Sequence, residues 1–93
     1  MLQFVWDRAK AAANLQKHGV DFTEAATAFG DPLSITIPDP AHSEGEERWL
    51  LVGQTTAGKL LVVAHTERGD EIRLISARLA TRRERENYEK EPE

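Results

Sequence analysis

The sequence predicts one α+β domain over residues 1–93, with a small antiparallel β-sheet, two N-terminal helices and one C-terminal helix. Three observations support this prediction. Short apolar runs rich in β-branched residues recur in the second half, and connections of hairpin length join them. Two runs of helix-forming residues with capping signals precede them. A capping-box spacing follows them. The expected order of elements is therefore β-α-α-β-β-β-β-α.

The first third of the chain contains one short strand and two helices. Residues 2–6 are largely aromatic and β-branched, which predicts a strand. Asp7 is a suitable N-cap for a helix over residues 8–17, and Gly19 can adopt the left-handed conformation that ends such a helix. A second helix is expected over residues 22–29, because its apolar residues recur at the i, i+3, i+4 and i+7 positions of one face.

The rest of the chain predicts a sheet and a final helix. Strands are expected over residues 33–37, 48–53, 59–66 and 71–78, and the short loops between the last three force an antiparallel meander. Their apolar runs are nearly continuous, so we expect both faces of the sheet to be covered. Another protein chain is one candidate to cover one of these faces. The helix expected over residues 81–90 is polar on nearly all sides.

Composition excludes several classes of function. The chain has no cysteine, which removes disulfides, zinc–thiolate sites, iron–sulfur clusters and thiol nucleophiles. The N-terminus lacks an export signal, and no apolar run approaches the roughly 18 residues of a membrane helix, so we expect a cytoplasmic protein that binds no membrane. A domain this small has little room for a large cofactor pocket. We therefore expect no cofactor.

The net charge of −4, taken alone, argues against nucleic acid as a partner. However, the charge is uneven along the chain. Residues 1–47 carry a net charge of −5, residues 48–83 carry +4 and residues 84–93 carry −3. Six of the seven basic residues in the central block are arginines, whose planar guanidinium binds phosphate or carboxylate at two points. Surface solubility is the alternative interpretation of these arginines.

The three histidines, His18, His42 and His65, are candidates for proton transfer. No two of them share a metal-ligand spacing, so we expect no metal site. Each also has an ordinary structural interpretation. His18 can act as a cation at a helix C-terminus, His42 can be a surface loop residue, and His65 can be a half-buried strand residue.

Residues 42–48 place a histidine, carboxylates and an arginine together at the start of a strand. His42, Glu47 and Arg48 could supply a general base, a general acid and a phosphate clamp there. The alternative is a solvated loop with a local Glu–Arg ion pair.

Arg73 interrupts an apolar strand. Alternation places it on one sheet face with Ile75, and places Ile72, Leu74 and Ser76 on the other face. An arginine in that position needs a partner, which could be an internal carboxylate such as Glu47 or an RNA phosphate.

Two further basic groups stand at the ends of the predicted elements. Arg78 follows the last strand and could lie at the sheet end with Arg48 or Arg68. The final helix carries basic residues and one aromatic residue, for which a solvated helix with Glu–Arg pairs is the alternative interpretation. These helix residues are Arg82, Arg83, Arg85 and Tyr88.

Together these residues form a pattern that runs from Phe4 to Glu89 and resembles the BrnT toxin family. The matching residues are Phe4, Trp6, Asp7, Lys10, Asn14, Lys17-His18-Gly19-Val20, Phe22, Ala25, Phe29, Asp31-Pro32, His42-Ser43, Glu47-Arg48, Gly53, Leu60-Leu61-Val62-Val63, Thr66-Glu67-Arg68, Ile72-Arg73, Ile75-Ser76-Ala77-Arg78, Ala80-Thr81, Glu84 and Tyr88. The resemblance is more specific than any single motif, because it fixes residue identities in order through every expected element.

The resemblance implies a cytoplasmic ribonuclease toxin of a bacterial type II toxin–antitoxin system with a RelE-like fold. It implies metal-independent RNA cleavage by the 2′-OH and inhibition of translation. It also implies hetero-oligomer formation with a BrnA-like antitoxin, a ribbon–helix–helix protein, so that DNA is bound only indirectly. We expect the antitoxin to cover the basic sheet face and the C-terminal helix.

The resemblance also implies site roles. Arg48, Arg68, Arg73 and Arg78 would stabilise the phosphate, with Arg73 the first choice, and His18, His42, His65, Lys17 and Glu47 would serve proton transfer. Lys17, Arg82, Arg83 and Tyr88 would contact RNA. The alternative hypothesis is a non-catalytic module that binds protein or RNA, because the catalytic spacing is weak and the final helix is polar.

Overall fold

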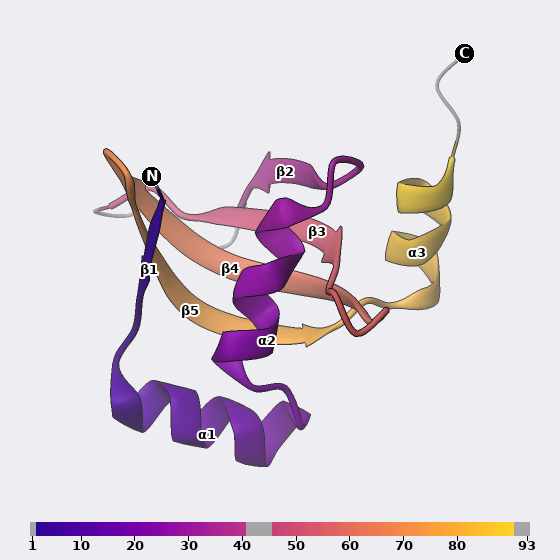
Figure 1. Ribbon diagram of the computed structural model, residues 1–93. Helices are drawn as coiled ribbons and strands as arrows, with labels where there is room; N and C mark the ends of the chain where they lie inside the picture. The colour runs from indigo at the N-terminus through magenta and orange to yellow at the C-terminus, as the bar shows by residue number, and fades with distance from the viewer. Residues whose placement is uncertain (1, 41–45, 91–93) are drawn as a thin grey trace.

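The computed structural model describes residues 2–40 and 46–90, and Figure 1 shows the arrangement of their helices and strands. The elements in chain order are β1 (Gln3–Val5), α1 (Arg8–His18), α2 (Phe22–Thr27), the 3₁₀ turn η1 (Ala28–Gly30), β2 (Ile35–Pro38), β3 (Trp49–Gln54), β4 (Leu60–Arg68), β5 (Glu71–Leu79) and α3 (Arg82–Glu89). The predicted α+β class and the predicted order of elements are confirmed. In the described residues, no helix is long and apolar enough to span a membrane.

The five strands form one sheet in the order β1-β5-β4-β3-β2. Strands β3 to β5 form the antiparallel meander that the short loops predict, and β2 pairs with β3 in an antiparallel manner as well. β1 instead pairs with β5 in parallel, with Phe4 opposite Ile72, so the sheet is mixed rather than wholly antiparallel. Loop lengths could not predict this pairing, because β1 is followed by two helices and its partner lies near the other end of the chain.

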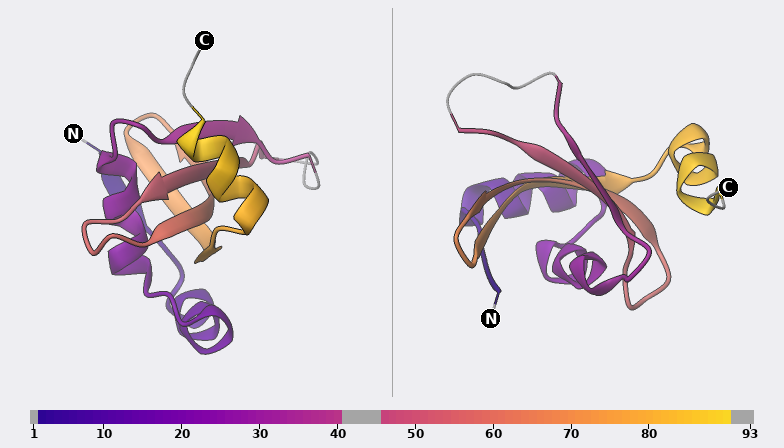
Figure 2. Two further views of the ribbon diagram at one scale, coloured as in Figure 1. Left: turned by 90° about the vertical axis from the view of Figure 1, so that its right-hand side faces the viewer. Right: turned by 90° about the horizontal axis from the view of Figure 1, so that it is seen from above.

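The helices lie on different sides of the sheet. We call the face that carries Leu61, Val63 and Leu74 the core face and the opposite face, which carries Val62 and Arg73, the outer face. Figure 1 and the right panel of Figure 2 show α2 against the core face, α1 near β5, and α3 beyond the end of the strands. The outer face is thus covered only in part among the described elements.

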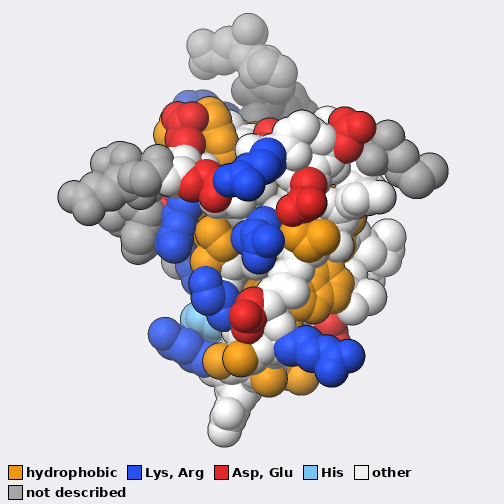
Figure 3. All heavy atoms as spheres, turned by 90° about the vertical axis from the view of Figure 1, so that its left-hand side faces the viewer, with side chains coloured by type: hydrophobic (Ala, Val, Ile, Leu, Met, Phe, Trp, Pro, Cys, Tyr) orange, Lys and Arg blue, Asp and Glu red, His pale blue; other side chains and the backbone are white. Residues whose placement is uncertain are grey.

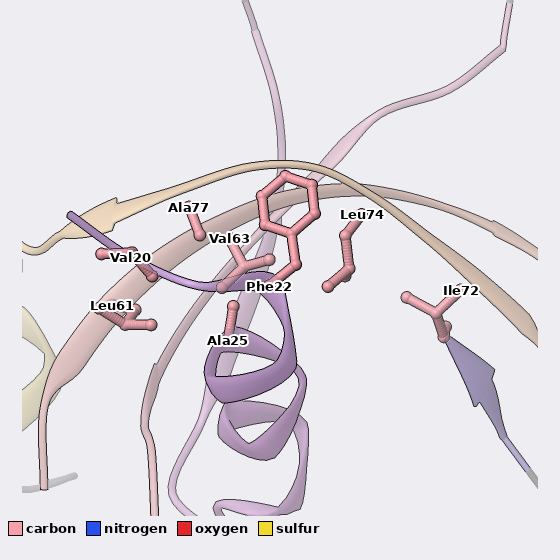
Figure 4. Close-up of a cluster of buried hydrophobic side chains, with 8 residues drawn as sticks. All are labelled: Val20, Phe22, Ala25, Leu61, Val63, Ile72, Leu74 and Ala77. Carbon is pink, nitrogen blue, oxygen red and sulfur yellow. The ribbon is translucent and has the colours of Figure 1, made fainter. Parts of the chain in front are cut away.

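The hydrophobic core lies between α2 and the core face, as Figure 4 shows. Phe22 and Ala25 of α2 are buried against Leu61 and Val63 of β4. Trp6 packs edge-on against Phe22, with 5.9 Å between the ring centroids. The apolar stripe expected on the second helix is therefore the stripe that closes the core, although the helix becomes a 3₁₀ turn at residue 28.

A β-bulge in β5 corrects the face assignment made by simple alternation. His65 of β4 lies opposite Leu74, but the preceding Ala64 lies opposite Ser76, so Ile75 is the extra residue. The bulge reverses the alternation. Consequently Ala77, and not Ser76, is the next residue buried in the core after Leu74.

The helix ends follow the local sequence signals. The Asp7 side chain accepts from the backbone N–H of Lys10, and Asp21 caps α2 in the same way. Gly19 ends α1 with φ at 71°, and Thr81 forms the predicted capping box with Glu84 at the start of α3. These ends depend on residues at most four positions apart, which is why sequence alone predicts them.

Asn14 joins α1 to the part of β5 that β1 does not reach. Its side-chain amide accepts from the backbone N–H of Ala77 at 2.9 Å and donates to the carbonyl of the same residue at 2.9 Å. It also donates to the carbonyl of Val20 at 3.0 Å, and it is only 6% exposed. The side chain therefore satisfies backbone groups that a longer β1 would otherwise pair.

Gly53 of β3 lies directly beneath η1. A Cβ atom at this position would lie 2.8 Å from the carbonyl oxygen of Ala28, a contact that the backbone must move to relieve. We expect Gly53→Ala to lower the free energy of unfolding by about 1–3 kcal/mol. Gly30→Ala is the matched control, because a Cβ there would meet nothing within 4 Å. Urea unfolding of both variants checks this, and equal midpoints would contradict the account of the β3–η1 contact.

Candidate functional site

The outer face bears a polar cavity of about 260 Å³ near the turn between β4 and β5. We call it the arginine cavity. Its lining residues are Glu46, Thr66, Arg68, Glu71 and Arg73. The strand register brings four of them together, because Thr66 lies opposite Arg73 and Arg68 lies opposite Glu71. The tight turn at Gly69, whose φ is 58°, sets that register.

The two arginines of this cavity are in different electrostatic states. Arg68 forms an ion pair with Glu46 at 3.2 Å, although its side chain is 80% exposed, so the pair is weak. Arg73 is exposed, and no hydrogen bond or ion pair joins its guanidinium to another described residue, Glu47 included. Arg73 therefore presents a two-point anion-binding group next to a second arginine and two carboxylates.

His65 lies apart from this cavity, fully buried on the core face opposite Leu74. Its ring packs edge-on against Phe29 with centroids 4.8 Å apart. Nε2 lies 3.0 Å from Glu67 Oε2, and Nδ1 lies 3.1 Å from the carbonyl of Val63. These two contacts fix the orientation of the buried ring.

His18 lines a second cavity, of about 300 Å³, between α1 and β5. The residues of this α1 cavity are Lys10, Ala13, Asn14, Lys17, His18, Ile75 and Ser76. Lys17 and His18, both expected site residues, thus lie together, but on a different element from the arginine cavity. Figure 3 views the molecule from the side that lies at the left of Figure 1. Lys and Arg side chains are visible from the top to the bottom of this view, with acidic side chains among them.

The segment just before β3 contributes fewer residues to the arginine cavity than the sequence predicts. Glu47 is exposed and Arg48 is half-buried, and neither lines the arginine cavity. His42 lies outside the described residues. Glu46, which sequence reasoning does not select, is the residue of this segment that reaches the cavity.

Arg78 is bound to α3. Its two terminal nitrogens donate to the two carboxylate oxygens of Glu84 at 2.8 and 2.9 Å. This ion pair raises the pKa of Arg78 and is the largest cause that lowers the pKa of Glu84, to about 2. Partial burial opposes the shift of Glu84, and the Thr81 backbone N–H assists it. Arg78 thus already has a carboxylate as its partner.

Tyr88, expected to contact RNA, attaches α3 to the loop before β2. Its hydroxyl donates to Asp31 Oδ2 at 2.5 Å, and this hydrogen bond raises the pKa of Tyr88 to about 12. Partial burial raises the pKa of Asp31, but the hydrogen bonds from Tyr88 and from the backbone amides of Gln54 and Leu33 outweigh it, so the pKa is lowered overall.

The remaining basic residues of α3 face solvent. Arg82 pairs with Glu86 at 3.3 Å with 93% of its side chain exposed, and Arg83 is also exposed. Between α3 and the outer face lies an apolar groove of about 140 Å³. Ile37, Val52 and Tyr88 are among its lining residues. Much of α3 is therefore a solvated helix with Glu–Arg ion pairs. This is the alternative interpretation of its basic residues that the sequence offers.

The Glu84–Arg78 pair makes the attachment of α3 dependent on pH. Because the pKa of Glu84 falls from 4.5 to about 2 on folding, its stabilisation is present above pH 4.5 and is lost as the pH falls towards 2. We expect Glu84→Gln to destabilise the protein at neutral pH, with a difference that shrinks below pH 4.5. Urea unfolding at several pH values measures this. Glu86→Gln is the control and should have little effect at any pH, so equal behaviour of the two variants would refute the assignment.

The site residues that sequence reasoning missed are Glu46, Thr66, Glu71, Lys10 and Ser76. The hairpin register supplies a signal for two of them, because a two-residue turn after Arg68 places Glu71 opposite Arg68 and Thr66 opposite Arg73. In the described part of the chain, no three His, Asp or Glu side chains are grouped so that they could hold a metal ion.

Comparisons with known proteins agree on one family. The profile of a family described as "Ribonuclease toxin, BrnT, of type II toxin-antitoxin system" matches residues 6–84. The fold is similar to the crystal structure of the Brucella abortus ribonuclease toxin BrnT, with a TM-score of 0.64 and 21% sequence identity. That match covers 88% of this chain and 100% of the Brucella chain. No curated protein matches the sequence.

Proposed function

The chain belongs to the BrnT family of ribonuclease toxins of type II toxin–antitoxin systems, and we propose that it cleaves RNA in the arginine cavity without a metal ion. The observation that carries this proposal is Arg73. It is an exposed guanidinium without a partner among the described residues, in a cavity that also holds Arg68 and two carboxylates. RNA phosphate is an anion that such a group binds at two points.

In the proposed reaction the ribose 2′-oxygen attacks the adjacent phosphorus, and the bond from phosphorus to the 5′-oxygen breaks. The products are a 2′,3′-cyclic phosphate and a 5′-hydroxyl, so no water and no oxidant is consumed. Arg73 and Arg68 stabilise the additional negative charge on the phosphate oxygens in the transition state. The 2′-OH loses its proton to a base, and the leaving oxygen gains one from an acid.

The carboxylates of Glu46 and Glu71 supply the proton acceptor in this proposal, because both line the cavity. His42 and Glu47 stay as predicted proton-transfer groups on the segment next to Glu46. His65 is left out, because it is fully buried on the opposite face of the sheet. Arg78 is left out because it is bound to Glu84.

Metal chelation tests this proposal directly. We expect the purified protein to cleave mRNA, either free or bound to ribosomes, at the same rate in EDTA as in buffer with Mg²⁺. The reason is that guanidinium groups supply the positive charge that a metal would otherwise provide. Activity that disappears in EDTA and returns with a divalent cation would overturn the metal-independent mechanism.

We also propose that a BrnA-like, DNA-binding antitoxin neutralises the protein in the cytoplasm by covering the outer face and α3. The apolar groove beside α3 and the arginine cavity lie on the same face of the sheet, towards opposite ends of β4, and both would then be buried. Such an interface combines apolar and ionic contacts, so we expect the dissociation constant of the complex to rise with ionic strength. An affinity that is flat from low to high salt would contradict the electrostatic part.

A further inference from the structure

We propose that the α1 cavity is a second phosphate subsite, which binds the RNA backbone near the phosphate held in the arginine cavity. The inference rests on the proposed function and adds a location to it. Its ligand class is the phosphodiester of single-stranded RNA. Lys10 and Lys17 bind the phosphate, and Ser76 can donate a hydrogen bond from β5.

The chemistry of the lining favours an anion. Lys10, Lys17 and His18 approach the cavity from α1, and among the described residues no Asp or Glu lines it. Lys10 and Lys17 are seven positions apart, which is close to two helical turns, so both lie on one side of the helix. An open hollow of about 300 Å³ that is lined by two lysines and a serine, with no carboxylate among its described residues, suits an anion better than a cation.

Helix stability does not account for all three basic residues. Lys17 and His18 lie in the last turn of α1, where positive charge stabilises the helix dipole. Lys10 lies in the first turn, where the same dipole disfavours a cation, and that turn contains no acidic residue. The N-cap carboxylate of Asp7 accepts from the Lys10 backbone N–H but forms no ion pair with the Lys10 ammonium, so a bound anion gives that ammonium a partner that it lacks among the described residues.

Some cations of the protein are neutralised by a carboxylate, and within the described part of the chain the lysines of the α1 cavity are not. Lys59 pairs with Glu24 at 3.7 Å, and Arg78 pairs with Glu84. Among the described residues, no ion pair involves the ammonium of Lys10 or Lys17. Their charges are therefore available to a ligand, as the charge of Arg73 is.

The β-bulge connects the two cavities. Because Ile75 is the extra residue, Ser76 lies opposite Ala64 while Arg73 lies opposite Thr66, and Ala64 and Thr66 share the outer face. Ser76 and Arg73 thus emerge on the same face, about 7 Å apart along the strand, because their partners Ala64 and Thr66 are two residues apart. An RNA strand that follows β5 can place neighbouring phosphates at both positions, roughly one or two nucleotides apart.

Binding of an uncleavable RNA tests the inference. The probe is a mixed-sequence single strand of about ten nucleotides with 2′-O-methyl sugars throughout. For Lys10→Ala/Lys17→Ala we expect Kd to rise about tenfold at low salt. The slope of log Kd against log salt should fall by about 0.7 for each phosphate that the variant no longer neutralises. The matched control is Lys59→Ala/Lys90→Ala, which removes the same charge elsewhere and should keep the wild-type slope.

Equal affinities and equal slopes for the two double variants would overturn the subsite. A cleavage assay separates this failure from failure of the proposed function. A dinucleotide contains only the scissile phosphate, so the Lys10→Ala/Lys17→Ala substitution should reduce cleavage of longer RNA by a larger factor than cleavage of a dinucleotide. A wild-type protein that cleaves no RNA would refute the proposed function, and the binding comparison would still decide the subsite.

Discussion

Replacing Arg73 with alanine should reduce the rate of RNA cleavage by about 10²–10³-fold, the usual effect of removing one group that stabilises developing charge in a transition state. Single-turnover cleavage of one RNA by wild type and variant measures this. The fold should be unaffected, because the Arg73 side chain is exposed and makes no hydrogen bond or ion pair with the described residues. The loss should therefore appear in the rate and not in the unfolding midpoint.

Two further variants sharpen the interpretation. Arg73→Lys keeps the charge but loses the planar two-point donor, so we expect a rate between those of wild type and Arg73→Ala. Lys59→Ala removes one positive charge at the β3–β4 end of the molecule, where its partner is Glu24, and should cleave RNA like wild type. If Arg73→Ala and Lys59→Ala cleave equally fast, Arg73 is not part of the catalytic site.

Replacing Asn14 with alanine should lower the free energy of unfolding by about 2–4 kcal/mol, the largest effect on stability that we expect from one substitution in α1. The change removes three hydrogen bonds of 2.9–3.0 Å and leaves backbone groups of Val20 and Ala77 without these partners. For a domain of 93 residues this is a large share of the total stability.

Urea unfolding followed by tryptophan fluorescence measures the effect, since Trp6 and Trp49 both lie in the folded part. Gln16→Ala is the control on the same helix. Gln16 is exposed, so that change should stay within about 0.5 kcal/mol of wild type. Equal stabilities of the two variants would show that the amide of Asn14 does not hold α1 against β5.

Local signals account for what the sequence predicts well. Asp7, Gly19 and Thr81 end or begin helices through hydrogen bonds to residues a few positions away, and the structure confirms each of them. The meander from β3 to β5 follows from short loops in the same way. Alternation alone identifies Arg73 as an arginine without an obvious partner, and it is exposed beside Thr66.

Long-range pairings account for what could not be predicted. The parallel pairing of β1 with β5 joins residues nearly 70 positions apart, and Asn14 meets Ala77 across 63 positions. The bulge at Ile75 depends on how β4 and β5 fit together, and it reverses the expected facing of Ser76. His65 lies beside Phe29, a neighbour that no local pattern supplies.

Net charge is also a poor guide to the ligand. The value of −4 averages a basic centre with two acidic ends, whereas a bound phosphate responds mainly to charges within about 8–10 Å. The two cavities along β5 are such local features. No Asp or Glu lines the α1 cavity among the described residues, and in the arginine cavity Arg68 pairs with Glu46 while Arg73 has no described partner.

The chemical ends of the RNA fragments test the central claim most directly. Digestion of a defined RNA in EDTA, followed by mass spectrometry of the fragments, should show a 2′,3′-cyclic phosphate on each upstream fragment and a 5′-hydroxyl on each downstream fragment. RNA with 2′-deoxy sugar at the cleavage position should stay intact. Fragments that carry 5′-phosphates, or cleavage at a deoxy position, would contradict attack by the 2′-oxygen.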